Sequence, residues 1–119
     1  MIDVRTRAEW NYVGVPDLSR LNKQPILAEW QRYPDMQVDP GFTDGVVGEL
    51  ERRGVGKAAP LLFLCRSGAR SLAAARALTA AGFTSCFNIS DGFEGPLDPD
   101  AHRNTIAGWR ASGLPWRQA

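Results

Sequence analysis

The stretch that decides the fold is Leu61-Leu62-Phe63-Leu64-Cys65-Arg66-Ser67-Gly68-Ala69-Arg70-Ser71, together with the alanine-rich segment that follows it. Residues 61–64 are apolar without polar alternation, which is typical of a strand covered on both faces of a parallel sheet. Residues 71–81 are rich in alanine, the best helix former, and Gly82 is a suitable helix stop. We therefore expect a buried strand, a short loop that begins at Cys65, and a helix over 71–81.

Working outward, three more segments have the apolar character of strands, namely Ile2–Val4, Pro25–Ala28 and Cys86–Ile89. Thr43 is a predicted N-cap for a helix that Gly54 ends. Strands and helices then alternate along the chain, which favours an α/β domain with a parallel sheet and right-handed crossovers. In such sheets the functional site lies at the carboxyl ends of the strands, and Cys65 is at one of these ends.

The tail from Gly95 onward is read mainly as structural. Asn104 or Thr105 is predicted to begin a last helix that ends at Gly113. The tryptophans in this tail are expected to cover the sheet, and the single histidine is expected at the surface. One histidine and two distant cysteines cannot assemble a metal site, so neither a metal nor another cofactor is expected.

Composition limits the classes of function. The chain has 119 residues, which predicts one domain over 1–119, and its 14 Lys and Arg against 13 Asp and Glu give a net charge of +1. That balance gives no reason to expect a nucleic acid or an anionic membrane as partner. Residues 1–5 become charged at once and lack the apolar core of a secretory signal, and no later stretch is long enough to span a bilayer. The expected location is the cytoplasm.

The loop after Cys65 has the composition of an anion-binding site. A thiol acts as a nucleophile when it is a thiolate, so its pKa must fall from the ordinary value of about 8.5. Backbone N–H groups between a strand end and a helix start can converge on one point, with the positive end of the helix dipole behind them. Gly68 permits a positive φ there, and Arg66 and Arg70 add two cations. A thiolate, a persulfide or an anionic substrate would fit such a loop.

The alternative is that Cys65 is simply a small buried hydrophobe, which is the usual role of an intracellular cysteine. The ordered combination of strand, cysteine, glycine-containing loop with two arginines and helix start favours the reactive thiol. Cys86 is read as a strand residue, and a disulfide to Cys65 or a role as resolving thiol is a minor alternative.

With these residues in place, the sequence resembles the rhodanese family in three segments. Leu64-Cys65-Arg66-Ser67-Gly68-Ala69-Arg70-Ser71 is similar to its active-site loop, Asp3-Val4-Arg5-Thr6-Arg7-Ala8-Glu9-Trp10 to its early Asp-x-Arg segment, and Ala81-Gly82-Phe83 through Asn88-Ile89-Ser90-Asp91-Gly92-Phe93 to its closing strand and turn. The resemblance implies a three-layer α/β domain with a central parallel sheet flanked by helices. It also implies that the cysteine accepts a sulfane sulfur as a persulfide and passes it to a nucleophile.

Carried over to this sequence, the resemblance makes Cys65 the catalytic nucleophile and sulfur carrier. The backbone amides of Arg66, Ser67, Gly68, Ala69, Arg70 and Ser71 would hold the outer sulfur, and Arg66 and Arg70 would bind an anionic donor such as thiosulfate. Asp3 and Arg5 would support the loop through hydrogen bonds and ion pairs. Glu9 is an alternative partner for one of the arginines, and a solvated surface carboxylate is at least as good a reading.

The sequence departs from the family pattern at two places. Family members usually have another strand and helix before Asp-x-Arg, whereas this chain starts at Met1. A sheet without that strand would expose unpaired backbone groups, which predicts marginal stability, a compensating C-terminal segment or self-association. Asp91 stands before Gly92 where a second glycine is common, which affects the turn more than the chemistry.

The expected activity is sulfur transfer from a small donor to a thiophilic acceptor, with a sulfur-carrier protein among the acceptors. A cysteine-dependent phosphatase or arsenate reductase also places a thiolate at a helix start, but its pattern has five residues between Cys and Arg, and Cys65 and Arg70 enclose four. A non-catalytic rhodanese-like binding module is the third reading, although such modules generally lack the cysteine. The sequence leaves the physiological donor and acceptor open.

Overall fold

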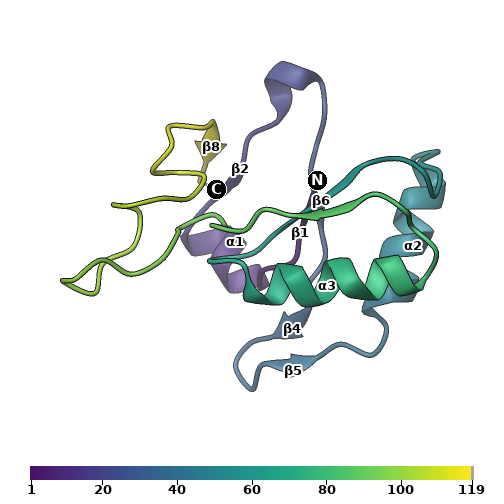
Figure 1. Ribbon diagram of the computed structural model, residues 1–119, viewed down its shortest axis with the longest axis horizontal. Helices are drawn as coiled ribbons and strands as arrows, with labels where there is room; N and C mark the ends of the chain where they lie inside the picture. Colours follow the sequence, from purple (N-terminus) through teal and green to yellow (C-terminus); the bar gives the residue numbers. More distant parts are fainter. Residues whose placement is uncertain (119) are drawn as a thin grey trace.

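The protein is described from a computed structural model that covers residues 1–118. Its main sheet has four parallel strands in the order β3-β1-β6-β7, with helices packed against it, which confirms the predicted rhodanese-like α/β fold class (Figure 1). The elements follow in the order β1 (Ile2–Asp3), α1 (Arg7–Tyr12), β2 (Val15–Pro16), η1 (Ser19–Leu21), β3 (Ile26–Leu27), β4 (Gln31–Arg32), β5 (Gln37–Val38), α2 (Phe42–Arg52), β6 (Leu61–Leu64), α3 (Ala69–Ala80), β7 (Cys86–Asn88) and β8 (Trp116–Arg117).

The core forms because residues two apart on a strand share one face of the sheet. Ile2 of β1 pairs with Ile26 and Phe63 of the neighbouring strands, and all three are buried in one apolar cluster. Helices α2 and α3 complete this cluster through their apolar faces, which contribute Phe42, Val46, Leu50, Ala74, Ala75 and Leu78. The cluster fixes β6 in the sheet and so holds Cys65 at its end.

The four predicted strands are present, each within two residues of its expected bounds. The helix after Cys65 is also present, but it begins at Ala69, two residues earlier than predicted, because Gly68 is the N-cap. The prediction that Thr43 caps the preceding helix is wrong, since that helix begins at Phe42 with Gly41 as N-cap. The carboxylate of Asp39 accepts from the Gly41 amide at 2.9 Å. This hydrogen bond stabilises a turn at residues 39–41, so the helix begins before Thr43.

The predicted last helix is wrong. Residues 101–115 form bends and turns instead, and Asn104 and Gly108 have positive φ values of 66° and 109°. Two backbone amides there bond outside the segment: Asn104 N–H donates to the Glu94 carbonyl at 2.7 Å, and Trp109 N–H donates to the Gly92 carbonyl at 2.9 Å. A helix that begins at residue 104 or 105 would need the Trp109 amide for a carbonyl four residues back, so contact with the 92–95 turn replaces it.

Two small pairings of strands lie outside the main sheet. β4 and β5 form an antiparallel hairpin, and β8 pairs with β2, which ties the C-terminal segment to the region of α1 on one side of the molecule (Figure 1). The C-terminal segment therefore does not add a strand to the main sheet, where β7 is an edge strand with Phe87 53% exposed.

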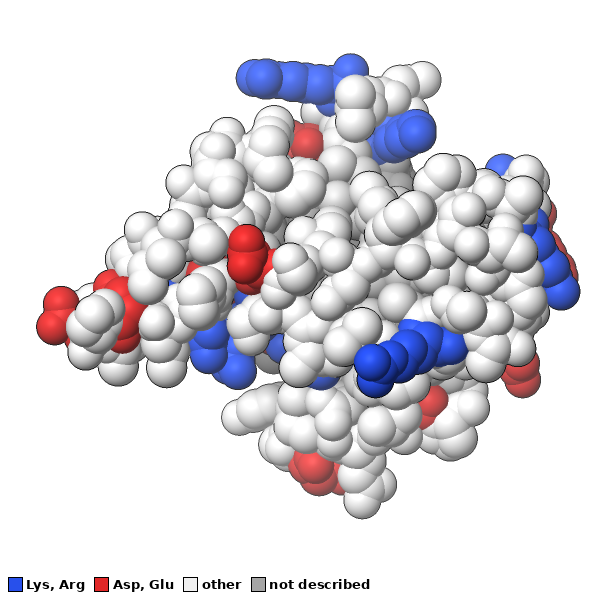
Figure 2. Space-filling model, viewed as in Figure 1, with Lys and Arg blue, Asp and Glu red and all other residues white. Residues whose placement is uncertain are grey.

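Two surface properties bear on possible partners. No helix within residues 1–118 is long and apolar enough to cross a lipid bilayer. On the face shown in Figure 2, lysine and arginine side chains lie apart from one another, with uncharged surface between them. That face carries no broad positive patch of the kind that binds a phosphate backbone.

Candidate active site around Cys65

Cys65 follows β6 directly, and its side chain is 1% exposed at the base of a cleft. Its carbonyl accepts from the Phe93 amide at 2.8 Å, which joins the loop to the turn after β7. The short segment from Arg66 to Gly68 then leads into α3. The predicted order of strand, cysteine, loop and helix start is therefore confirmed.

The loop after Cys65 packs so closely against the turn at residues 90–92 that one position in each of them requires glycine. Gly68 has a φ of 114°, as the sequence predicts, and a Cβ there would overlap the Ser90 carbonyl oxygen. Gly92 has a φ of 70°, and a Cβ there would overlap the Arg66 carbonyl group. A side chain at either position would push the loop away from the 90–92 turn. These contacts fix the path of the backbone around the thiol.

The sulfur of Cys65 is held by a backbone amide and a hydroxyl. The Gly68 amide donates to Sγ at 3.1 Å, and the Ser71 hydroxyl lies 3.2 Å from Sγ. Burial raises the pKa of the Cys65 thiol, but hydrogen bonding from the Ser71 side chain and from the amides of Ser71, Gly68 and Ser67 outweighs it, so the pKa lies below its ordinary value. The stabilisation of the thiolate thus comes from the loop backbone and Ser71.

Ser71 is itself held by β7, through a residue that the sequence reading did not select. Its hydroxyl lies 2.5 Å from Asn88 Oδ1 and 3.2 Å from the Gly68 carbonyl, and the Asn88 amide group donates to the same carbonyl at 3.1 Å. Because a hydroxyl has one proton to donate, Asn88 and the Cys65 thiolate compete for it. Asn88 therefore fixes the position of the Ser71 oxygen.

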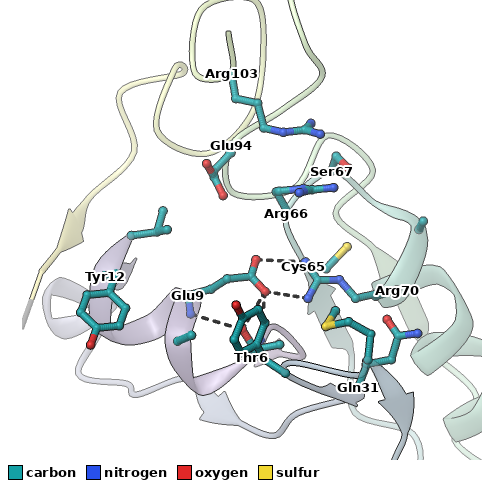
Figure 3. Close-up of a pocket in the computed structure, with 15 residues that line it drawn as sticks. Thr6, Glu9, Tyr12, Gln31, Cys65, Arg66, Ser67, Arg70, Glu94 and Arg103 are labelled. Carbon is teal, nitrogen blue, oxygen red and sulfur yellow. Dashed lines mark hydrogen bonds and ion pairs between the residues drawn. The ribbon is translucent and has the colours of Figure 1, made fainter. Parts of the chain in front are cut away.

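Arg70 is paired with Glu9, so that carboxylate is a partner of a loop arginine and not a solvated surface group. Its Nη1 and Nη2 lie 2.7 and 3.0 Å from the two carboxylate oxygens, in a fork geometry (Figure 3). Burial raises the pKa of Glu9, but the bonds from Arg70 and from Thr6 outweigh it and the pKa is lowered. Burial likewise lowers the pKa of Arg70, and Glu9 raises it by more. With Glu9 on its fork, Arg70 anchors the loop to α1.

Arg66 is the unpaired cation of the loop. It lines the cleft, its side chain is exposed, and within residues 1–118 it forms no ion pair. Arg103, from the C-terminal tail, lines the same cleft and donates to the Gly95 carbonyl at 2.7 Å. Figure 3 shows both guanidinium groups on the side of the cleft opposite Glu9, with Glu94 near them. Sequence reasoning missed Arg103, because nothing local distinguishes it from a surface arginine.

Asp3 and Arg5 lie beneath the site, and both are 0% exposed. Their side chains form a buried ion pair at 2.6 Å, and Arg5 also donates to the Gly14 carbonyl at 2.8 Å. No hydrogen bond joins either side chain to residues 66–71 in the described chain. The guanidinium of Arg5 stacks 4.2 Å from the centre of the Phe93 ring. The backbone amide of Phe93 in turn donates to the Cys65 carbonyl. Contact between this pair and the loop is therefore indirect, through Phe93.

The other residues singled out from the sequence lie away from the thiol. Both cysteines are free, and Cys86 is half-buried at the start of β7, paired with Leu61 at the opposite end of β6 from Cys65. His102 is exposed in a turn. Trp116 packs edge-on against Phe93 at 6.3 Å. No group of three His, Cys, Asp or Glu side chains within residues 1–118 is placed to hold a metal ion.

Comparison with known proteins agrees with this geometry. A family model described as the Rhodanese-like domain matches residues 1–96. Uncharacterized proteins of Rickettsia conorii and Rickettsia prowazekii are 40% and 37% identical over 117 residues, which is 98% of this chain and 81% of theirs. The crystal structure of Rv0390 from M. tuberculosis superposes with a TM-score of 0.84 at 47% identity and covers 99% of this chain and 83% of that one.

Proposed function

Because the chain belongs to the rhodanese-like domain family, we propose that it is a sulfurtransferase that carries a sulfane sulfur as a persulfide on Cys65. The observation that carries the proposal is the thiol itself. Loop amides and Ser71 lower its pKa in spite of burial that raises it, so the site favours the nucleophilic thiolate form of a cysteine that lines a cleft.

The proposed reaction has two steps. In the first, the Cys65 thiolate attacks the outer sulfur of a donor such as thiosulfate, a sulfur–sulfur bond forms, and sulfite leaves with the electron pair of the broken bond. In the second, a thiophilic acceptor, either a small nucleophile or a sulfur-carrier protein, attacks the outer sulfur and Cys65 is released as a thiolate. The Gly68 amide and the Ser71 hydroxyl, which lie 3.1 and 3.2 Å from Sγ, would stabilise the thiolate before the first step and after the second. Arg66 would bind the oxygens of the donor.

The geometry also bears on the two rival readings. A phosphatase needs a loop wide enough for a tetrahedral phosphate and an arginine free to bind it. Here four residues separate Cys65 from Arg70, and the Arg70 guanidinium is held by Glu9. A binding module without chemistry would have no need of a thiolate whose pKa is lowered against burial. Sulfur transfer needs only a short loop that holds one sulfur atom and a cysteine whose pKa is lowered.

The reaction requires a compartment in which thiols stay reduced, and we assign it to the cytoplasm on that ground. The proposal needs no cofactor, nucleic acid or membrane, since the thiol and the donor carry all the bonds that change.

The test is the intact mass of the protein after incubation with thiosulfate and removal of the excess. We expect one added sulfur atom in the wild type and in Cys86→Ser, the matched control, and none in Cys65→Ser. Full thiosulfate-to-cyanide transfer by Cys65→Ser would refute the proposal. Efficient hydrolysis of an aryl phosphate by the wild type would favour the phosphatase instead.

A further inference from the structure

The cleft above Cys65 is much larger than thiosulfate requires. Its volume is about 850 Å³, and sites for organic ligands of drug size occupy about 300–1,000 Å³. An inorganic anion seated on Arg66 would leave most of this space to water. The size of the cleft therefore points to an organic substrate.

One side of the cleft is apolar and comes from two segments that are distant in the sequence. Helix α1 and the residue after it contribute Ala8, Tyr12 and Val13, and the β4–β5 hairpin contributes Tyr33 and Met36. The two tyrosines are 81% and 69% exposed, and Met36 has a φ of 54°, which residues other than glycine rarely adopt. Single exposed aromatic residues are common, but aromatic and apolar side chains gathered around a reactive thiol form a surface for an apolar group.

The charge of the cleft favours a donor with one negative charge over a donor with two. Three guanidinium groups line it, those of Arg66, Arg70 and Arg103, against the two carboxylates of Glu9 and Glu94, which leaves one positive charge in excess to offset the Cys65 thiolate. Because Glu9 holds Arg70, the excess lies on the side of Arg66 and Arg103. A dianion such as thiosulfate is only half neutralised there, and it must also approach the Cys65 thiolate.

We infer that this cleft selects an organic thiosulfonate, with one negative charge and an aromatic or other apolar body, over inorganic thiosulfate. The inference rests on the proposed function and assigns the substrate class of the same site. The sulfonyl oxygens face Arg66, and the apolar body lies against Tyr33 and Met36. The Cys65 thiolate attacks the terminal sulfur, the sulfur–sulfur bond of the donor breaks, and an organic sulfinate leaves with the electron pair. Two anions enter and two anions result, so no oxidant or reductant is needed.

The experiment compares benzenethiosulfonate with methanethiosulfonate, which share the reacting group and charge and differ in the body. The readout is kcat/KM for sulfur transfer to cyanide, measured in the wild type and three variants. Tyr33→Ala removes an aromatic ring from the cleft, Tyr33→Phe keeps it, and Val38→Ala changes an exposed side chain of the same hairpin that does not line the cleft.

We expect the wild type to prefer benzenethiosulfonate by about tenfold or more, a factor typical of burying one aromatic ring. In Tyr33→Ala the kcat/KM for benzenethiosulfonate should fall while that for methanethiosulfonate stays unchanged, so most of the preference is lost. Tyr33→Phe and Val38→Ala should keep it. Equal kcat/KM for the two donors, or a preference that Tyr33→Ala leaves intact, would overturn the inference.

A binding measurement separates this inference from the proposed function. Benzenesulfonate and methanesulfonate lack the transferable sulfur, so they bind without reacting, and their protection of Cys65 against alkylation is measured. Stronger protection by benzenesulfonate supports the inference and equal protection overturns it. If thiosulfate loads Cys65 but neither comparison shows a preference, sulfur transfer stands and the substrate class is wrong. If no donor loads Cys65, both fail.

Discussion

Replacing Ser71 by alanine removes the side-chain hydroxyl that lies 3.2 Å from the sulfur of Cys65. A hydrogen bond to a charged group contributes about 1.5–3 kcal/mol. We take the lower end, about 1.5 kcal/mol, because the hydroxyl is shared with Asn88 and with the Gly68 carbonyl. That free energy corresponds to a thiolate fraction up to about tenfold lower, and the full factor is reached at a pH below the pKa of Cys65 in both proteins. The amides of Gly68 and Ser67 remain in Ser71→Ala and prevent a larger loss.

The assay is the rate at which iodoacetamide alkylates Cys65, in a Cys86→Ser background so that one thiol reacts. At neutral pH we expect Ser71→Ala to react more slowly than the parent, and the difference should approach about tenfold as the pH is lowered below the pKa of Cys65 in both proteins. At a pH high enough to deprotonate both proteins fully, the two rates should converge, which excludes a change in access to the thiol.

Asn88→Ala provides the contrast. It removes the group that competes for the Ser71 proton while the hydroxyl stays in place, so alkylation at neutral pH should be as fast as in the parent or faster. Alkylation of Ser71→Ala at the parental rate at neutral pH would show that the hydroxyl does not stabilise the thiolate. The account of the lowered pKa would then be wrong.

Further predictions concern the two ion pairs near the site. Asp3→Asn leaves the buried guanidinium of Arg5 without its carboxylate and should lower the free energy of unfolding by about 3–5 kcal/mol. Glu49→Gln removes a carboxylate that forms exposed pairs with Arg52 and Arg53, and it should change the free energy of unfolding little. Urea denaturation measures both, and similar losses would contradict this reasoning. The pKa of Glu9 in the folded protein lies below its ordinary value of 4.5, so the stability from its pair with Arg70 is present above that pH and is lost as the pH falls through the folded-state pKa. Glu9→Gln should therefore be less stable than the wild type at neutral pH, with a difference that shrinks in acid; a constant difference across that range would count against the pair.

Much of the sheet was predictable because its signals are local. The apolar run Leu61–Leu64 and the alanines after Cys65 specify strand and helix without reference to the rest of the chain. Helix α1 was predictable too, since Thr6 and Glu9 are three residues apart in a capping-box pattern. The structure has both of its hydrogen bonds, from the Glu9 amide to the Thr6 side chain and from the Thr6 amide to the Glu9 side chain. Apart from this pattern nothing marks the helix, because it has only six residues and none of them is buried.

What the sequence could not provide depends on contacts between distant residues. Glu9 and Arg70 are 61 residues apart, and only the folded chain shows that the pair occupies the fork of Arg70 and leaves Arg66 open. The last helix failed for a related reason, because the amides of Asn104 and Trp109 bond to the turn after β7 and not to their own segment. Tertiary contact outweighed local propensity there.

The tail beyond residue 96 contributes to the cleft, although the family model does not extend over it. Residues 97–118 lie outside the matched range, yet they supply Arg103 to the cleft and Trp116 to the packing around Phe93. A protein trimmed to residues 1–96 would keep the complete nucleophile loop while losing one of the three guanidinium groups, so its cleft would hold less positive charge for an anionic donor. Relatives that share the loop but differ in this tail are then expected to share the chemistry and diverge in the sulfur compounds they accept.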